Sequence, residues 1–440
     1  MNKRFYQKVL AIVIAMGMVL GSSLGVSAAV ELGDTGRVES NDTTLTLKKG
    51  IVVYNTEGSK VYYPNITYNY ALAPVDVTDK TPTVSDDGGD MAYVVDGVTG
   101  GLTCATSSLT FDNTATIAAA AAGTEITMPI TITADTSKFT KAGIYRYKLT
   151  ETVETSNLTA ASITRPSGYS SERYIDVYIT YDSSSGYKVK GYVCFIADGV
   201  DKKIDGKTSD NNDNEITAKS SGFVNAYDTD ASTGTTTTTT GHADQYYTYN
   251  LTVTKTITGT GAETTHPFPF AINTSGVTSQ PFSVTTDGSS LSLTTAGAVD
   301  SSFKGTTGTE FNVGLANGKN VKLIGLPASS KITKMQETND TNDTYKAKID
   351  FGSTHVLDET VKAPGATAEI PSAQAISNYS DYSTTGITQT DDDYAVTNTI
   401  VDVSPTGLIF RYSPYVLLLG ASFLLLLVMG RREKERDEEA

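Results

Sequence analysis

The sequence predicts an all-β protein built from two tandem β-sandwich domains. Tryptophan is absent, whereas 25 tyrosines and 38 glycines accompany many threonines and serines. Short stretches that alternate apolar and polar residues are separated by clusters of Gly, Asn, Asp and Ser, which is the spacing of sandwich strands. A threonine-rich run, Ser232–Gly241, interrupts these stretches and has no apolar side chain to bury. It therefore predicts an extended linker between the domains.

The domain boundaries follow from this interruption. We place immunoglobulin-like domains at residues 43–230 and 246–401, joined by the linker at 231–245. Inside the first domain, Ala115–Ala122 is the one stretch with helix propensity. That stretch fits an exposed loop or an irregular strand equally well.

The N-terminus is typical of a secretory signal peptide. Basic residues precede the apolar run Val9–Leu20, and small residues follow at Val26–Ala28. We predict a signal peptide at residues 1–28, which places the mature chain outside the membrane.

The C-terminus, residues 402–440, has two interpretations. Its apolar run Pro414–Gly430 is about long enough for a transmembrane helix, and the arginines after it mark a cytoplasmic end. One interpretation is a plain transmembrane anchor. The other is a cell-wall sorting signal, in which a transpeptidase cuts between Thr406 and Gly407 and passes the threonine carbonyl to an amine. We favour the sorting signal.

Composition excludes several classes of function. The net charge of −15 and the pI of about 4.7 argue against nucleic acid as a partner. The three histidines show no catalytic or zinc spacing, and the acidic patch Asp210–Glu215 is interpreted as a polar turn. We therefore expect no enzyme, no cofactor and no metal site. Cys104 and Cys194 could pair or stay separate, and in neither case do they form a disulfide framework.

Each domain opens with a strand that carries a lysine on its apolar face. Alternate residues of a strand share a face, so Lys49 lies with the apolar residues of Leu45–Ile51. In the same way Lys255 lies with those of Leu251–Ile257. A lysine on the core face is rare unless it has a partner.

Each domain also contains an inward carboxylate and ends with an inward asparagine. Glu151 shares a face with tyrosine and leucine side chains of its strand, and Glu337 shares one with Met335. Near the domain ends, Asn225 and Asn398 lie between apolar neighbours on one face. Both domains thus have the order Lys, Glu, Asn, with all three side chains expected in the core.

This set of side chains permits a self-catalysed amide exchange. Burial pushes a lysine toward the neutral amine and a glutamate toward the neutral acid. The amine can attack the asparagine carboxamide while the glutamic acid polarises it and moves protons, and ammonia leaves. The product is a Lys–Asn isopeptide bond, formed once without turnover. The alternative is a buried Lys–Glu salt bridge with an unrelated asparagine.

These residues resemble the major (backbone) pilins of Gram-positive bacteria, of the streptococcal T-antigen type. The resemblance covers both domains and the C-terminal segment. It rests on Leu45–Lys49, Pro64–Tyr68, Phe139–Glu151, Leu251–Lys255, and Val396–Asn398 shortly before Pro405–Gly407. The family usually has Glu or Gln, then Val, before Pro-Thr-Gly, where this chain has Val403 and Ser404.

The resemblance implies a role for each matching residue. Lys49 and Asn225 would form the first isopeptide bond with Glu151 as the catalytic acid. Lys255 and Asn398 would form the second isopeptide bond with Glu337 as the catalytic acid.

The resemblance also implies assembly. A sortase would join Thr406 of one subunit to a lysine of the next, for which Lys219 fits best, with Lys207 and Lys203 as rivals. The partners would be sortase, identical subunits, minor pilins and peptidoglycan, at the surface of a Gram-positive cell. The alternative function is a wall-anchored adhesin that binds a host ligand.

Overall fold

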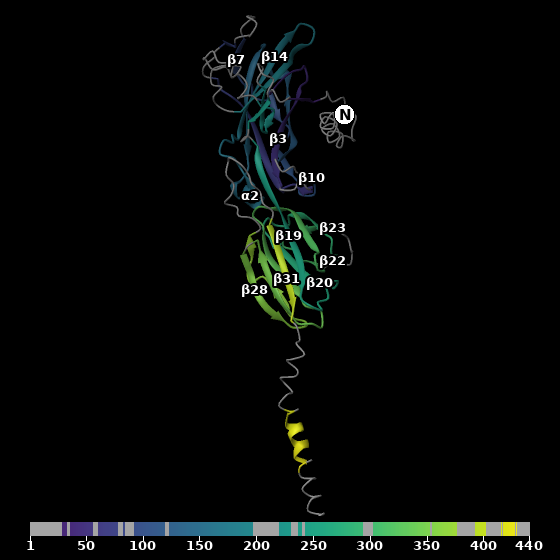
Figure 1. Cartoon of the computed structure of the whole chain (residues 1–440). Coiled ribbons are helices and arrows are strands. Elements are labelled where there is room, and N and C mark those ends of the chain that lie inside the picture. Colours follow the sequence, from purple (N-terminus) through teal and green to yellow (C-terminus); the bar gives the residue numbers. More distant parts are fainter. Residues whose placement is uncertain are drawn as a thin grey trace, which may run out of the picture. The chain divides into compact units, whose positions relative to one another are not determined.

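In a computed structural model the chain forms two β-rich units, Met1–Thr248 and Tyr249–Ala440 (Figure 1). The prediction of an all-β fold is confirmed. The structure describes residues 29–32, 36–55, 60–77, 82–83, 92–118, 123–196, 220–229, 236–239, 243–293, 302–352, 354–375, 392–401, 415, 417–426 and 428.

The first sheet of unit 1 is centred on the long strand β3. On one side of β3, two antiparallel strands follow one another. On the other side, several short segments pair with β3 in parallel. The members are β8 (Leu102–Cys104), β11 (Thr124–Ala134), β3 (Thr44–Tyr54), β1 (Val30–Glu31), β16 (Gly222–Phe223), the first residues of β19 (Asp244–Thr258), and β13 (Ile163–Thr164) beside β19.

Three segments cover the parallel edge of β3 in turn: β1, then β16, then β19. Gly222 of β16 lies so close to β3 that a Cβ atom would stand 2.2 Å from the carbonyl oxygen of Lys48. Only glycine fits there, and its φ of 142° is one that glycine adopts readily. The chain then leaves the edge and forms β17 (Ala226–Thr229) and β18 (Thr236–Thr239), which pair with each other. It returns to β3 at Asp244.

The second sheet of unit 1 faces the first. Its central strand, β12, pairs with β14 on one side, and on the other with β5 and, in parallel, with β7. The members are β2 (Arg37–Glu39), β15 (Gly186–Phe195), β14 (Glu172–Asp182), β12 (Gly143–Thr152), β5 (Ile66–Pro74), β9 (Ser108–Phe111), β7 (Ala92–Asp96) and β6 (Pro82–Thr83). Outside the two sheets lie β4 (Lys60–Tyr62), which pairs with β10 (Thr116–Ala118), the short helix α2 (Thr155–Ala160) and the 3-10 turn η1 (Thr136–Lys138).

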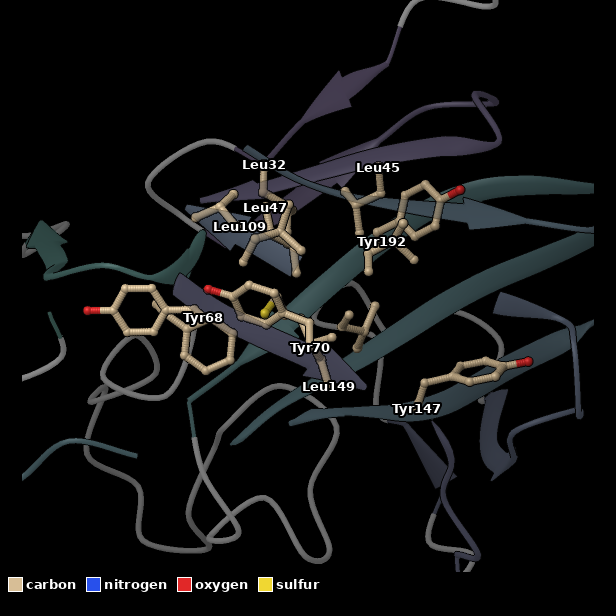
Figure 2. Packing of buried hydrophobic residues seen from close by; sticks show 14 of the residues in the cluster. Leu32, Leu45, Leu47, Tyr68, Tyr70, Leu109, Tyr147, Leu149 and Tyr192 are labelled. Carbon is tan, nitrogen blue, oxygen red and sulfur yellow. The ribbon is translucent and has the colours of Figure 1, made fainter. Parts of the chain in front are cut away.

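The core of unit 1 lies between these sheets (Figure 2). Leu45 and Leu47 project from β3, Tyr68 and Tyr70 from β5, and Leu149 from β12, all of them buried. Alternation along β3 and β12 brings Lys49 and Glu151 into the same layer as these apolar side chains.

Unit 2 is a second pair of facing sheets. The rest of β19 is the centre of one sheet, with β25 on one side and β31, in parallel, on the other. That sheet contains β23 (Ser302–Thr306), β21 (Pro281–Thr286), β25 (Asn320–Pro327), β19, β31 (Asp392–Ile400), β27 (Tyr345–Phe351) and β28 (Thr354–Lys362). The facing sheet contains β22 (Ser289–Leu293), β24 (Phe311–Leu315), β20 (Phe268–Ser275), β26 (Lys331–Thr338), β29 (Thr367–Glu369) and β30 (Gln374–Ala375).

Several expectations from the sequence can be compared with the structure. The strand expected to open the second domain begins at Asp244, and its first residues pair with β3 in unit 1. Part of Ala115–Ala122 is strand β10, whereas the helix α2 had no signal in the sequence pattern. Both cysteines are free. Among the described residues, no helix is long and apolar enough to cross a membrane. The predicted signal peptide, residues 1–28, lies outside them.

Candidate functional site

Unit 2 buries a lysine, a glutamate and an asparagine on facing sheets. Lys255 on β19 and Asn398 on β31 belong to the same sheet, and Glu337 comes from β26 of the opposite one. In the parallel register Asn398 stands opposite Ile257, two residues beyond Lys255. Residues two apart share a face, so both side chains point into the core.

These three groups converge on one carboxylate oxygen. Lys255 Nζ lies 2.5 Å from Glu337 Oε1, and Asn398 Nδ2 donates a hydrogen bond of 2.8 Å to the same oxygen. All three residues are at least 97% buried. The ring centres of Phe268 and Phe270 lie 4.7 and 5.9 Å from the lysine nitrogen, so two aromatic side chains line this site.

Burial shifts the pKa values of both members of this pair in the direction of their neutral forms. Burial lowers the pKa of Lys255 to about 8, although Glu337 opposes the shift. Burial raises the pKa of Glu337, and Lys255 and Asn398 offset only part of that rise. Among the described residues, Lys255 Nζ has no partner in hydrogen-bond alignment despite the short approach to Glu337, and Asn398 Oδ1 has none either. Proton transfer from the ammonium to the carboxylate would leave an amine beside a carboxamide whose carbonyl oxygen is unengaged.

Unit 1 contains a second buried cluster around Lys49. The lysine projects from β3, and Glu151 projects from β12 on the facing sheet. Lys49 Nζ lies 3.2 Å from Glu151 Oε2, 2.9 Å from Asp244 Oδ2 and 2.9 Å from the hydroxyl of Tyr169. Lys49 and Asp244 are fully buried and Glu151 is 2% exposed.

Asn225 is not the residue that meets Lys49. Its backbone N–H donates to Glu125, and its side chain is only half-buried. The reason lies in the parallel edge of β3: β16 pairs Phe223 with Lys49, but the chain then leaves the edge. Asp244 enters opposite Ile51, the position that Asn225 would occupy if β16 continued. A carboxylate therefore stands where the sequence pattern predicted a carboxamide.

Arg165 completes the cluster, and the sequence pattern gave no sign of it. It follows β13 in an irregular stretch, where no strand alternation assigns its side chain to a face. Its Nε donates to Asp244 Oδ1 at 2.9 Å, and its Nη2 donates to Glu151 Oε1 at 2.7 Å. For Asp244 a signal exists: it shares a face with the buried Tyr246 in the alternating start of β19.

Three tyrosines surround the two carboxylates. Tyr68 donates to Asp244 at 2.8 Å, Tyr70 donates to Glu151 at 3.0 Å, and Tyr169 donates to Glu151 at 2.5 Å. Burial, followed by the neighbouring carboxylates, raises the pKa of all three hydroxyls. They therefore remain donors, and each carboxylate accepts at least one of these tyrosine hydrogen bonds.

The charge of Asp244 predicts an acid-sensitive first unit. Burial acts to raise the pKa of Asp244, but Lys49 and Arg165 outweigh it and the net shift is downward. A lowered folded-state pKa stabilises the fold above the unfolded pKa, about 3.9, and that stabilisation is lost as the pH falls through the folded value. Hydrogen exchange of β3 amides between pH 5 and pH 2 should show weakening protection in the natural protein. Asp244→Asn should show a smaller slope; an equal slope would assign the acid sensitivity to other groups.

Comparisons with known proteins give only distant likenesses. No protein-family model and no curated protein matches the sequence. The solved major pilin T-13 of Streptococcus pyogenes is 17% identical, with 83% of this chain and 99% of that chain covered and a TM-score of 0.36. The T3.2 major pilin of the same organism is 18% identical at 83% and 99% coverage, with a TM-score of 0.39. A pilus-presented adhesin is 13% identical at 80% and 99% coverage, with a TM-score of 0.22. Such values assign neither a role nor a site to this chain.

The residues predicted for assembly lie elsewhere. Thr406 and Gly407, at the expected cut, and Lys219, the expected acceptor, are outside the described residues.

Proposed function

We propose that this chain is a secreted structural protein whose second unit is closed by an isopeptide bond between Lys255 and Asn398. The observation that carries the proposal is the convergence of Lys255, Glu337 and Asn398 in an apolar core, with Glu337 Oε1 contacting both other groups. A buried lysine and glutamate would be an ordinary ion pair. The carboxamide beside them, with its carbonyl oxygen unengaged, supplies the third reactant.

The bond forms in balanced steps. Lys255 passes a proton to Glu337, and the resulting amine attacks Asn398 Cγ while the glutamic acid polarises the carbonyl oxygen. The new Nζ–Cγ bond forms, the Cγ–Nδ2 bond breaks, and the leaving nitrogen takes a proton through Glu337 and departs as ammonia. The rigid core supplies the proximity that this reaction needs. Glu337 relays a proton from the attacking amine to the leaving nitrogen and retains the proton that it first took from the Lys255 ammonium, so it ends this single turnover as the neutral acid.

The bond expected between Lys49 and Asn225 is not part of this proposal. Lys49 faces Asp244, and its hydrogen-bond partners are Glu151, Tyr169 and Asp244.

At the level of the cell, we assign the chain the role of a pilus backbone subunit. The support is the order of a secretory signal, two β-units and a sorting-type C-terminus with Pro405, Thr406 and Gly407. A sortase would cleave after Thr406 and join it to Lys219 of an identical subunit, and minor pilins and peptidoglycan would be further partners. The second candidate is a wall-anchored adhesin, which shares the anchor and needs no acceptor lysine.

Polymerisation has a direct test. Cell-wall extracts of the producing bacterium, boiled in SDS, should show a ladder of covalent multimers that react with an antibody to this chain. Thr406→Ala should collapse the ladder to monomer, whereas Thr354→Ala, at an exposed position of β28, should leave it intact. Lys219→Arg, compared with Lys207→Arg and Lys203→Arg, identifies the acceptor. Monomer alone in the unmodified strain would favour the adhesin.

A further inference from the structure

Each of the two buried clusters contains a lysine and a glutamate, but a different third side chain faces the lysine in each. In unit 2 the third group is the neutral carboxamide of Asn398. In unit 1 it is the carboxylate of Asp244, and a second cation, Arg165, lies against it. The same lysine–glutamate pair thus stands in two different electrostatic settings.

Arg165 contacts both carboxylates of the Lys49 cluster. It contacts both oxygens of Asp244, at 2.9 and 3.2 Å, and Oε1 of Glu151 at 2.7 Å. Its guanidinium also lies 4.0 Å from the ring centre of Tyr169. Because the side chain is 25% exposed while both carboxylates are fully buried, Arg165 reaches the cluster from its solvent side.

A charge count shows how Arg165 changes the net charge of the cluster. Lys49 and Arg165 carry two positive charges, and Glu151 and Asp244 carry two negative ones, so the ionised cluster is neutral. Without Arg165 the same cluster would bury one net negative charge, which is costly, and it would take up a proton. The cation therefore removes the need for either carboxylate to be protonated.

Lys49 has several acceptors around its side-chain nitrogen. The ammonium has three kinds of acceptor within 3.4 Å, namely Glu151, Asp244 and the hydroxyl of Tyr169. It also lies 4.1 Å from the ring centre of Tyr68. Lys255, by contrast, approaches a single carboxylate and has no aligned hydrogen-bond partner among the described residues.

We propose that Arg165 keeps the cluster of unit 1 ionised and unbonded, so that Lys49 and Asp244 remain an ion pair while unit 2 is cross-linked. The reason is chemical: an ammonium is not a nucleophile, and a carboxylate carbon resists attack because its negative charge is already delocalised over both oxygens. The inference rests on the proposed chemistry of unit 2, since it explains why a similar pair in unit 1 does not react. Arg165 is on this account a positioning residue that acts through the charges of Asp244 and Glu151.

Removing the charge of Arg165 should release the reaction. With one proton taken up, Lys49 as amine and Asp244 as carboxylic acid become accessible, and Nζ can attack Cγ. The new Nζ–Cγ bond forms, the bond from Cγ to the hydroxyl oxygen breaks, and water leaves with the proton that Glu151 carries to it.

The test uses the secreted protein and two matched variants. Arg165→Met keeps the length of the stem and removes the charge, and Arg165→Lys keeps the charge. The natural protein and Arg165→Lys should weigh about 17 Da less than their sequences, for one ammonia. Arg165→Met should weigh about 35 Da less, for one ammonia and one water. Peptide mapping should find Lys255 joined to Asn398 in all three, and Lys49 joined to Asp244 only in Arg165→Met.

Each outcome has one reading. A Lys49–Asp244 peptide in the natural protein overturns the inference, and so does its absence from Arg165→Met when protease resistance shows unit 1 to be folded. If Arg165→Met does not fold, Arg165→Gln replaces it, because glutamine removes the same charge and keeps a polar group at this position: the Lys49–Asp244 peptide should form with loss of water, and an unbonded Lys49 in the folded Arg165→Gln protein overturns the inference too. Absence of the Lys255–Asn398 peptide is a separate result, which would end the proposed function without bearing on the peptide of unit 1.

Discussion

Lys255→Met should lower the free energy of unfolding of unit 2 by about 5 kcal/mol, if the loop-entropy relation for disulfides applies to this bond. The proposed bond closes a loop of 398 − 255 = 143 residues, and a loop of that length restricts the unfolded chain strongly. Methionine has a stem of similar length, and Glu337 can become a neutral acid once its cation is gone, so packing changes little. Denaturant titration of unit 2 measures the loss, and mass spectrometry should find the variant at its sequence mass.

Two controls separate the bond from the side chain. Lys331→Met makes the same substitution at an exposed position of β26, and it should shift stability by less than about 0.5 kcal/mol and leave the ammonia loss unchanged. Glu337→Gln keeps Lys255 and Asn398 but removes the acid, so it should also remain unbonded. A cross-linked Glu337→Gln protein would remove Glu337 from the mechanism.

Arg146→Met should destabilise unit 1 by about 3–5 kcal/mol, the cost of leaving one member of a buried ion pair without its partner. Arg146 on β12 and Asp176 on β14 stand directly opposite each other, with Nε to Oδ1 at 2.7 Å and Nη2 to Oδ2 at 2.8 Å. Asp176 is fully buried, and burial raises its pKa against the opposing effect of Arg146. Hydrogen exchange of β12 and β14 amides gives the loss for this region alone.

The matched variant for this pair removes both charges. Arg146→Met combined with Asp176→Leu should recover most of the loss, because two apolar side chains of suitable volume leave no buried charge. A double variant as unstable as Arg146→Met would show that the pair contributes through its specific contacts with the strands and not through charge compensation.

The sequence carried enough information to predict the fold class and the buried groups on regular strands. Alternation along β3 and β19 identified Lys49 and Lys255 as core residues, and both are fully buried. The same rule identified Glu151, Glu337 and Asn398, whose strands run without interruption through the positions in question. Period-2 reasoning works there because one face of each strand is covered by the opposite sheet.

The rule failed where the chain leaves the ladder and returns. Asn225 has the correct register relative to β16, but the edge position opposite Ile51 belongs to Asp244. Local alternation cannot show that the last strand of a unit is supplied by two separate segments. The role of Arg165 could not be predicted for a related reason. It lies in an irregular stretch, where no periodicity indicates the direction of a side chain.

The parallel pairing of β19 with β31 has a mechanical consequence. The first and last strands of unit 2 lie side by side, and Lys255 and Asn398 stand almost in register across them. With the proposed bond in place, tension entering along β19 passes to β31 through covalent bonds. The loop of 143 residues that the bond closes is then shielded from this tension; fully extended, at about 3.4 Å per residue, it would otherwise lengthen to roughly 490 Å. With this bond in place, unit 2 keeps its folded length under tension.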